Sequence, residues 1–257
     1  ANVFASEEMF DNMINPVQMG VDTKGRLWAA VWPTYPKWEP LKQTNDALVI
    51  LPDKNRDGVA DEMITFAKVA NPTGFEFWNG GVIVASAPDL IYFKDTDGDD
   101  KYDTKEVLLS GFDDHDTHHA IAAFCVDASG AIHMAEGVFL HSNVETVYGP
   151  VRATNGGFFR YSPRTKKLTR HAQFSIPNPW GIAFDRYGQD FFLHTSGPSF
   201  SWMTPGTVKA VYGANLRAPS LLTSNSVRPT SGLEFVSSRH FPDEVQGDVL
   251  YLSLIHI

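Results

Sequence analysis

Short runs of alternating apolar and polar residues recur along this chain, and a glycine-containing turn separates each pair of runs. Alternation with a period of two is typical of β-strands that bury one face. Glycine suits the turn of such a hairpin because it adopts positive φ at little steric cost. We interpret the pattern as five copies of one hairpin, with turn glycines Gly25, Gly81, Gly130, Gly188 and Gly247.

The spacing of these glycines indicates a repeated structural unit. Successive turn glycines are separated by 56, 49, 58 and 59 residues. A hairpin that recurs at this spacing, with further strands between the copies, is the signature of propeller blades. The expected outer strands are Ala47–Leu51, Leu90–Phe93, Val107–Leu109, Gly157–Tyr161 and Val208–Tyr212. Because no segment keeps a helical period over three turns, the sequence predicts an all-β propeller.

The composition indicates which partners and cross-links this chain lacks. The 257 residues carry a net charge of −9, and nucleic-acid binding needs a basic surface, so we expect no nucleic-acid partner. We also expect no membrane span in this segment, because no apolar run is long enough. The single cysteine, Cys125, excludes an internal disulfide and is interpreted as a small core residue.

A polar segment before the third hairpin concentrates groups that can exchange protons. Three aspartates and three histidines lie within seven residues: Asp113, Asp114, His115, Asp116, His118 and His119. Imidazoles titrate near neutrality, so histidines beside carboxylates suit proton transfer or metal binding. The alternative is a solvated surface loop whose histidines satisfy nearby backbone groups.

Two acidic loops have the spacing of calcium ligands. Asp53–Asp61 places oxygen donors at positions 1, 3, 5 and 9, and Asp95–Glu106 places them at 1, 3, 5, 9 and 12. The second loop has Asp100 where calcium loops carry glycine, and strands flank both loops, so neither is an EF-hand. The alternative is a turn whose carboxylates accept backbone hydrogen bonds. The ligands expected in the second loop are Asp95, Asp97, Asp99, Asp103 and Glu106.

Several motifs, in this order, together resemble a known family. They are Gly74–Val84, Pro88–Asp99, Val107–Phe112, Asp116–His119, Asn178–Phe184 and Pro229–Phe235. The chain resembles the membrane-bound dehydrogenase domain abundant in planctomycetes and verrucomicrobia, which is related to the soluble quinoprotein glucose/sorbosone dehydrogenases. The resemblance implies a six-bladed propeller over residues 1–252 that ends within or before its last blade. Residues 253–257 do not resemble the family continuation.

The resemblance also implies an activity and its catalytic residues. It implies a dehydrogenase that oxidises a sugar or alcohol hydroxyl with pyrroloquinoline quinone (PQQ) and Ca²⁺. His119 matches the family's general base. His118 also fits, because the position of this histidine differs by one residue among family members. Asp116 is close enough in sequence to orient either imidazole. We expect His119 at the start of a strand, with His118 on the opposite face.

The cofactor and its calcium ion have matches of their own. Asn178 matches an asparagine that contacts the quinone, and Gly197 and Pro198 match a pair whose carbonyls hold the calcium. Ser196 stands where many relatives have an acidic residue. The relatives also hold the acidic cofactor with lysine and arginine from the strand that follows the one matching Gly247–Tyr251, and this sequence has no match to that strand. Arg217 and Arg228 carry charge that could hold the acidic cofactor, although neither lies in a matching motif. Of these, Arg228 is assigned to cofactor binding.

Two other functions stay open at this point. The first is a calcium-dependent lactonase or esterase, for which Glu76, Asn178 and Glu136 are the expected site residues. The second is a binding propeller without catalysis, because a fold does not fix a function. The resemblance further implies an extracytoplasmic location, periplasmic or at the cell surface, and a cytochrome c as candidate electron acceptor.

Overall fold

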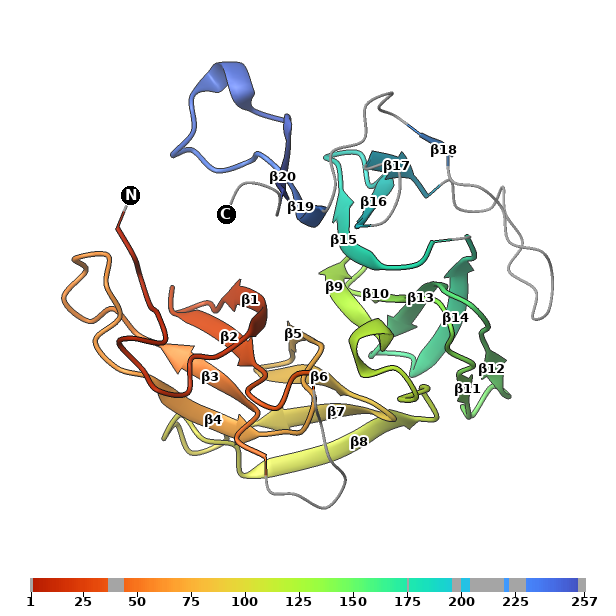
Figure 1. Ribbon diagram of the computed structural model, residues 1–257, viewed down its shortest axis with the longest axis horizontal. Helices are drawn as coiled ribbons and strands as arrows, with labels where there is room; N and C mark the ends of the chain where they lie inside the picture. The colour runs from red at the N-terminus through yellow and green to blue at the C-terminus, as the bar shows by residue number, and fades with distance from the viewer. Residues whose placement is uncertain are drawn as a thin grey trace. The chain divides into compact units, whose positions relative to one another are not determined.

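The computed structural model describes residues 2–36, 44–174, 176–195, 200–203, 220–221 and 230–253 (Figure 1). The chain divides into two compact units, Ala1–Ser110 and Gly111–Ile257. Within the described residues, regular structure is almost entirely antiparallel strand, with two short 3₁₀ helices. This content of strands confirms the all-β class. None of the helices in these ranges is long and apolar enough to span a membrane.

The first unit consists of two four-stranded antiparallel sheets, each with its strands in chain order. The first sheet contains β1 (Pro16–Val21), β2 (Leu27–Val31), β3 (Ala47–Leu51) and β4 (Ile64–Lys68). The second contains β5 (Gly74–Trp78), β6 (Gly81–Ser86), β7 (Asp89–Lys94) and β8 (Thr104–Ser110). Adjacent strands of a sheet are thus joined by hairpins, as in a propeller blade.

Aromatic side chains fill the space between these two sheets. Trp28 of β2 contacts Phe66 of β4 at 4.7 Å and Phe77 of β5 at 5.3 Å between ring centroids. The same buried cluster includes Leu48 of β3 and Phe93 of β7. Aromatic rings bury a large apolar area each, and edge-to-face contacts add to that gain. The aromatic residues of this unit therefore serve as core.

The second unit contains two further four-stranded sheets. The first consists of β9 (Ala122–Val126), β10 (Ile132–Glu136), β13 (Gly157–Ser162) and β14 (Lys167–Ala172). A short hairpin of β11 (Asn143–Val144) and β12 (Val151–Arg152) lies between β10 and β13 in the chain. The other sheet consists of β15 (Pro179–Phe184), β16 (Asp190–His194), β17 (Phe200–Trp202) and β18 (Ser220–Leu221).

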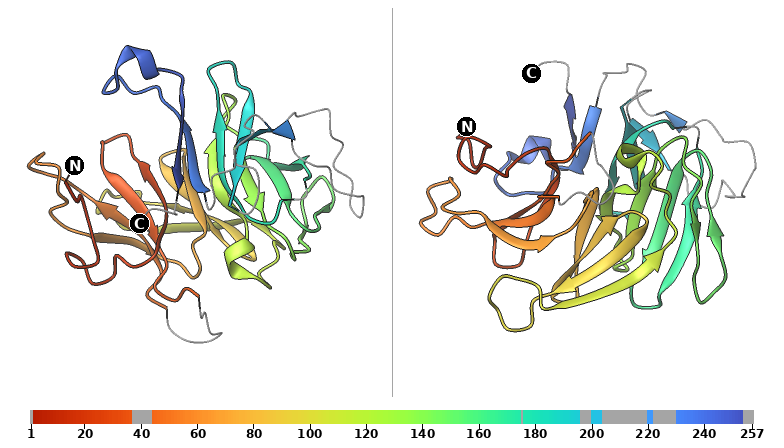
Figure 2. Two further views of the ribbon diagram at one scale, coloured as in Figure 1. Left: turned by 45° about the horizontal axis from the view of Figure 1, so that its top comes forward. Right: turned by 60° about the horizontal axis from the view of Figure 1, so that its bottom comes forward.

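These two sheets pack face to face on an apolar core, and Figure 2 shows them side by side in green and cyan. Phe158 of β13 contacts Phe192 of β16 at 4.9 Å between ring centroids, and Phe174 stacks on Phe192 at 5.3 Å. The unit continues with the paired strands β19 (Thr230–Phe235) and β20 (Val249–Ser253). Between them lies the 3₁₀ helix η2 (Asp243–Val245).

Three of the hairpin turns share one construction around an aspartate. These aspartates are Asp22, Asp127 and Asp185. One carboxylate oxygen of each accepts hydrogen bonds of 2.8–3.1 Å from the backbone N–H groups two and four residues later. The glycine three residues after each aspartate has φ between 79° and 81°, which side chains disfavour. The turns at Gly25, Gly130 and Gly188 are therefore confirmed.

The prediction that Gly81 is a turn residue is wrong by one position. The turn consists of Asn79 and Gly80, with φ values of 48° and 74°, and Gly81 is the first residue of β6. Gly81 is required for another reason, because a Cβ there would lie 2.4 Å from the carbonyl oxygen of Phe93. A two-residue turn with positive φ at both positions matches the twist of a hairpin.

The structure thus has four propeller-like blades among the described residues. Every expected outer strand is present except Val208–Tyr212, which lies outside the described residues. The fifth hairpin copy forms the β19–β20 pair. A six-bladed ring stays a prediction.

Candidate functional site

His118 and His119 lie on a short 3₁₀ helix, η1 (Thr117–His119), rather than on a strand, and Asp116 directly precedes this helix. The two oxygens of Asp116 bind one histidine each, with 2.8 Å from Oδ1 to Nδ1 of His118 and 2.8 Å from Oδ2 to Nδ1 of His119. The two imidazole rings lie 4.0 Å apart. The expectation that His118 and His119 point to opposite faces of a strand is therefore wrong. Strand β9 begins only at Ala122, so the alternation rule does not apply to them.

Residues from two other segments hold His119 in place. Its side chain is 9% exposed, and its ring meets Phe139 edge-on at 5.7 Å. The backbone N–H of Gly137 donates to the carbonyl of His119, and a Cβ at Gly137 would lie 2.8 Å from both His119 Cδ2 and the Pro177 carbonyl oxygen. Because Asn178 follows Pro177, the fold brings the predicted Asn178 into the neighbourhood of His119.

The pairing with Asp116 fixes the chemistry of the two imidazoles. A histidine that donates Nδ1–H to a carboxylate keeps its lone pair on Nε2. His119 thus has Nε2 as its basic nitrogen. Burial, and then repulsion from His119, lower the pKa of His118, while Asp116 opposes this shift. His118 is the more exposed ring, at 39%.

Glu136 is a second ionisable group near His119, at the end of β10 and directly before Gly137. It is fully buried, and its Oε2 accepts a hydrogen bond from the Ser142 hydroxyl. Burial raises the pKa of Glu136 to about 7, against the attraction of Arg170 and the Ser142 hydrogen bond. A carboxyl group with such a pKa can exchange protons near neutrality.

Arg170 of β14 is a half-buried cation whose Nε and Nη1 atoms are buried, and its charge attracts Glu136. Its Nη2 donates to the Gly156 carbonyl at 2.9 Å, and its guanidinium lies 4.5 Å from the centroid of the Phe159 ring. Burial lowers the pKa of Arg170 to about 10, so it stays charged at neutral pH. Gly157, with φ of 130°, leaves room for it, because a Cβ there would lie 2.4 Å from Nη2 and would clash with it.

Sequence reasoning missed Ser142, Phe139 and Arg170. Ser142 also accepts the backbone N–H of Asp113 at 2.9 Å, and Asp113 Oδ2 accepts the backbone N–H of His141 at 2.6 Å. These bonds tie the histidine-rich segment to the chain that follows β10. No local pattern identifies such partners, because Ser142 and Phe139 lie in a loop without periodicity and Arg170 lies 34 residues after Glu136.

The two acidic loops occupy equivalent places in the first unit. One closes the β3–β4 hairpin and the other closes β7–β8, where it projects beyond its sheet in Figure 2. Both have positive φ at their fourth and sixth residues, which are Arg56, Gly58, Gly98 and Asp100. The loops are therefore two copies of one conformation.

Three of the five predicted ligands of the second loop lie together. One oxygen each of Asp95, Asp97 and Asp103 lies within 4.8 Å of the others. Asp99 accepts the backbone N–H of Lys101 at 2.8 Å, and Glu106 lies on β8 opposite Tyr92, outside this group of three. Hydrogen bonds from the Thr96 backbone and hydroxyl, and from Thr104, hold the pKa of Asp103 low.

Asp100 shows why this loop departs from the glycine pattern. Its φ is 64°, in the region that usually requires glycine. Its Oδ1 lies 2.8 Å from Nη1 of Arg26 and 4.0 Å from Nζ of Lys24, both in the β1–β2 turn. The aspartate thus anchors the loop on the neighbouring sheet of the same unit.

The remaining predicted residues are dispersed. Gly197, Pro198 and Arg228 lie outside the described residues. Glu76 lies on β5 in the first unit, half-buried, and burial raises its pKa against a hydrogen bond from the Phe77 N–H. Glu76 and Glu136 therefore belong to different units.

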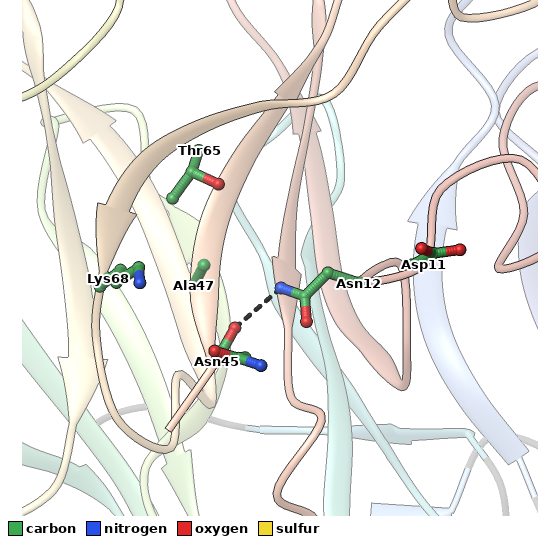
Figure 3. Close-up of a pocket in the computed structure, with 6 residues that line it drawn as sticks. All are labelled: Asp11, Asn12, Asn45, Ala47, Thr65 and Lys68. Carbon is green, nitrogen blue, oxygen red and sulfur yellow. Dashed lines mark hydrogen bonds between the residues drawn. The ribbon is translucent and has the colours of Figure 1, made fainter. Parts of the chain in front are cut away.

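A surface pocket of about 370 Å³ lies elsewhere, in the first unit (Figure 3). Its lining residues are Asp11, Asn12, Asn45, Ala47, Thr65 and Lys68. Asn12 Nδ2 donates to the Asn45 carbonyl at 2.8 Å across it. None of the predicted site residues lines this pocket, so we place no chemistry there.

A family model described as a domain of unknown function, DUF7133, matches residues 1–248. The chain belongs to the DUF7133 family. No curated protein sequence matches it.

Several solved structures share the fold of this DUF7133 chain. The PQQ-bound aldose sugar dehydrogenase of Streptomyces coelicolor has a TM-score of 0.54 and 11% identity, over 87% of this chain and 74% of that one. A carbohydrate-active enzyme of family AA12 from Trichoderma reesei has a TM-score of 0.51 and 11% identity, over 95% and 64%. A candidate gluconolactonase has a TM-score of 0.50 and 11% identity, over 88% and 74%. At such identities the likeness shows the propeller fold alone.

Proposed function

We propose that this DUF7133 chain is a quinoprotein-type dehydrogenase that oxidises a hydroxyl group of a sugar or alcohol, with His119 as general base. One observation carries the proposal: Asp116 Oδ2 lies 2.8 Å from Nδ1 of a His119 that is held by packing. A carboxylate that orients an imidazole is the arrangement used to remove a proton from a hydroxyl. The shared fold with a PQQ-bound sugar dehydrogenase supports the same direction.

The chain's own residues would act as follows. Asp116 holds Nδ1–H of His119, so that Nε2 faces the substrate with its lone pair. Nε2 takes the hydroxyl proton, and Asp116 stabilises the imidazolium that results. PQQ, when bound, supplies the acceptor for the two electrons and the carbon-bound hydrogen. His118 shares the same carboxylate and limits its rotation.

The residues near His119 fit part of such a cofactor site. The Asn178 amide, placed by the contact of Pro177 with Gly137, would donate to or accept from the quinone edge. The carbonyls of Gly197 and Pro198 would hold a Ca²⁺ ion that acts as a Lewis acid. Arg228 would pair with the cofactor's carboxylates. These last three residues are carried over from the sequence resemblance.

A calcium-dependent lactonase or esterase is the second candidate function. Glu136 favours it, because a buried carboxyl with a pKa of about 7 beside the His119 segment is suited to general acid–base catalysis. The fold likeness to a candidate gluconolactonase is in keeping with it. A propeller that binds a ligand without catalysis remains the third outcome of the test.

The location and partners are part of the same proposal. We propose that the protein works outside the cytoplasm and passes electrons from a small sugar or alcohol to a cytochrome c. The acidic chain, with its net charge of −9, would be complementary to a basic cytochrome.

The test uses the whole chain with PQQ and Ca²⁺. Quinone binding is titrated by absorbance, and dye reduction is then measured with a panel of aldoses and alcohols. A parallel panel of lactones is run without quinone. The proposal expects quinone-dependent dye reduction. Lactone hydrolysis that is lost in Glu136→Gln would establish the second candidate instead, and binding without turnover of either panel would establish the third.

A further inference from the structure

A second group of histidines and a carboxylate lies between the two four-stranded sheets of the second unit. It consists of His133 on β10, His171 on β14 and Asp190 at the start of β16. One ligand atom of each residue lies within 4.8 Å of the other two. The two imidazole rings meet edge-on, 4.5 Å apart. The group is separate from the Asp116–His118–His119 group.

A hydrogen bond to Asp127 orients His133 as a metal ligand. Its Nε2 lies 3.1 Å from Asp127 Oδ2, the carboxylate of the β9–β10 turn, which also binds Arg160 Nε at 2.7 Å. This bond places the proton on Nε2 and the lone pair on Nδ1. Nδ1 is buried and has no hydrogen-bond partner, in a side chain that is 1% exposed. Metal-binding histidines commonly donate their other N–H to a carboxylate in this way.

Asp190 also has an unused donor atom. Its Oδ2 is bonded to Nε2 of His171, while Oδ1 is buried and has no hydrogen-bond partner. Buried polar atoms without partners are costly, because they lose hydration without replacing it. Two such atoms, one nitrogen and one oxygen, in a single group of three residues indicate that something else satisfies them.

A β-bulge directs His171 toward this group. Phe158 pairs with Ala172 and Phe159 pairs with Arg170, so that His171 is the extra residue of β14. Bulges redirect one side chain relative to the sheet and are frequent beside functional sites. Because of the bulge, the His171 side chain extends along its own sheet toward His133, which lies two strands away in that sheet.

We propose that His133, His171 and Asp190 bind a structural Zn²⁺ ion between the two sheets. One nitrogen from each imidazole and the carboxylate of Asp190, mono- or bidentate, give three or four ligands of the type that zinc prefers. Ca²⁺ and Mg²⁺ are disfavoured because they take oxygen ligands. The ring of Phe184 packs on His133 at 4.9 Å. This apolar cover makes the site structural, since a catalytic site requires access for substrate.

The ion would take the place of the proton in the hydrogen bond between His171 and Asp190. A ligand distance of about 2.0–2.2 Å requires the three side chains to move together by a small amount from their present separation. Because the ligands come from β10, β14 and β16, the ion would cross-link the two sheets. It would therefore stabilise the second unit without touching the proposed catalytic group.

The experiment measures zinc content after chelation, reloading with Zn²⁺ and dialysis. The background is Asp116→Asn, which disables the other histidine group as a competing site. The proposal expects about one equivalent of retained zinc in this background, and about none when Asp190→Asn or His171→Gln is added. His141→Gln, an exposed histidine in the same unit, is the matched control and should retain the ion.

Equal zinc retention with and without Asp190→Asn and His171→Gln would overturn the proposal, and so would no retention in the Asp116→Asn background. Circular dichroism checks that each variant folds. If a variant does not fold, Co²⁺ replaces Zn²⁺ in the Asp116→Asn chain. Intense visible absorption bands of tetrahedral Co²⁺ are then expected, and only the weak bands of octahedral Co²⁺ would contradict the site. Neither readout depends on the proposed dehydrogenase activity.

Discussion

Replacement of Glu136 by glutamine tests the electrostatics of the candidate site. Burial raises the pKa of Glu136 from 4.5 to about 7, so the folded chain keeps a proton there that the unfolded chain has lost. The protonated Glu136 therefore stabilises the folded chain fully below the unfolded pKa of 4.5, and this stabilisation is lost as the pH rises through the folded pKa of about 7. Each pKa unit corresponds to about 1.4 kcal/mol, so the free energy of unfolding should fall by about 3 kcal/mol over this window.

Glutamine keeps an oxygen for the Ser142 hydroxyl but does not ionise, so Glu136→Gln should escape this loss. The expected readout is the difference in melting temperature between variant and wild type, measured from about pH 4.5 to about pH 8. At about 2–4 °C per kcal/mol for a chain of this size, the difference should change by about 6–12 °C in favour of the variant. Other titrating groups cancel because they are present in both proteins.

The matched control is Glu234→Gln, at an exposed position of β19. Its melting temperature should follow the wild-type profile across the whole pH range. Parallel profiles for Glu136→Gln and wild type would refute the reasoning, since they would mean that Glu136 has the same pKa in the folded and unfolded chains.

Three further predictions concern the turns, the calcium loop and the second histidine. Gly81→Ala should destabilise the fold by more than Gly25→Ala, for which about 1 kcal/mol is expected. A Cβ at Gly81 has no room, while one at Gly25 meets nothing within 4 Å. Equal melting temperatures of the two variants would contradict this prediction. The Asp97→Ala, Asp99→Ala double variant should lose the heat of calcium binding in titration calorimetry, and unchanged heats would exclude the loop. His118→Ala should lower the melting temperature, since it removes one partner of a carboxylate; an unchanged value would exclude this structural role.

The blades were predictable because their signal is local. An aspartate, a glycine three residues later and alternating residues on both sides are enough to specify a hairpin, as at Asp22 and Gly25. The error at Gly81 came from a shorter turn, in which Asn79 and Gly80 take the positive φ values. Two adjacent glycines leave the register of such a turn undetermined by sequence alone.

The candidate site was predictable in its composition but not in its geometry. Asp116 and His119 are three residues apart, so any compact turn brings them together. The single 3₁₀ turn that places both histidines on one carboxylate has no periodic signature. The burial of Glu136 depends on strands far apart in the chain. The same holds for the His133 group, because a bulge that redirects His171 leaves no mark in the sequence.

The turnover number of His119→Ala, measured with PQQ and Ca²⁺ present, tests the central claim most directly. Loss of a general base should lower turnover by about 10²–10⁴-fold and leave the affinity for the quinone nearly unchanged. His118→Ala is the control and should keep turnover within about threefold of wild type, because Asp116 can still orient His119. Near-normal turnover in His119→Ala would contradict the account, as would a wild-type chain that shows no quinone-dependent turnover.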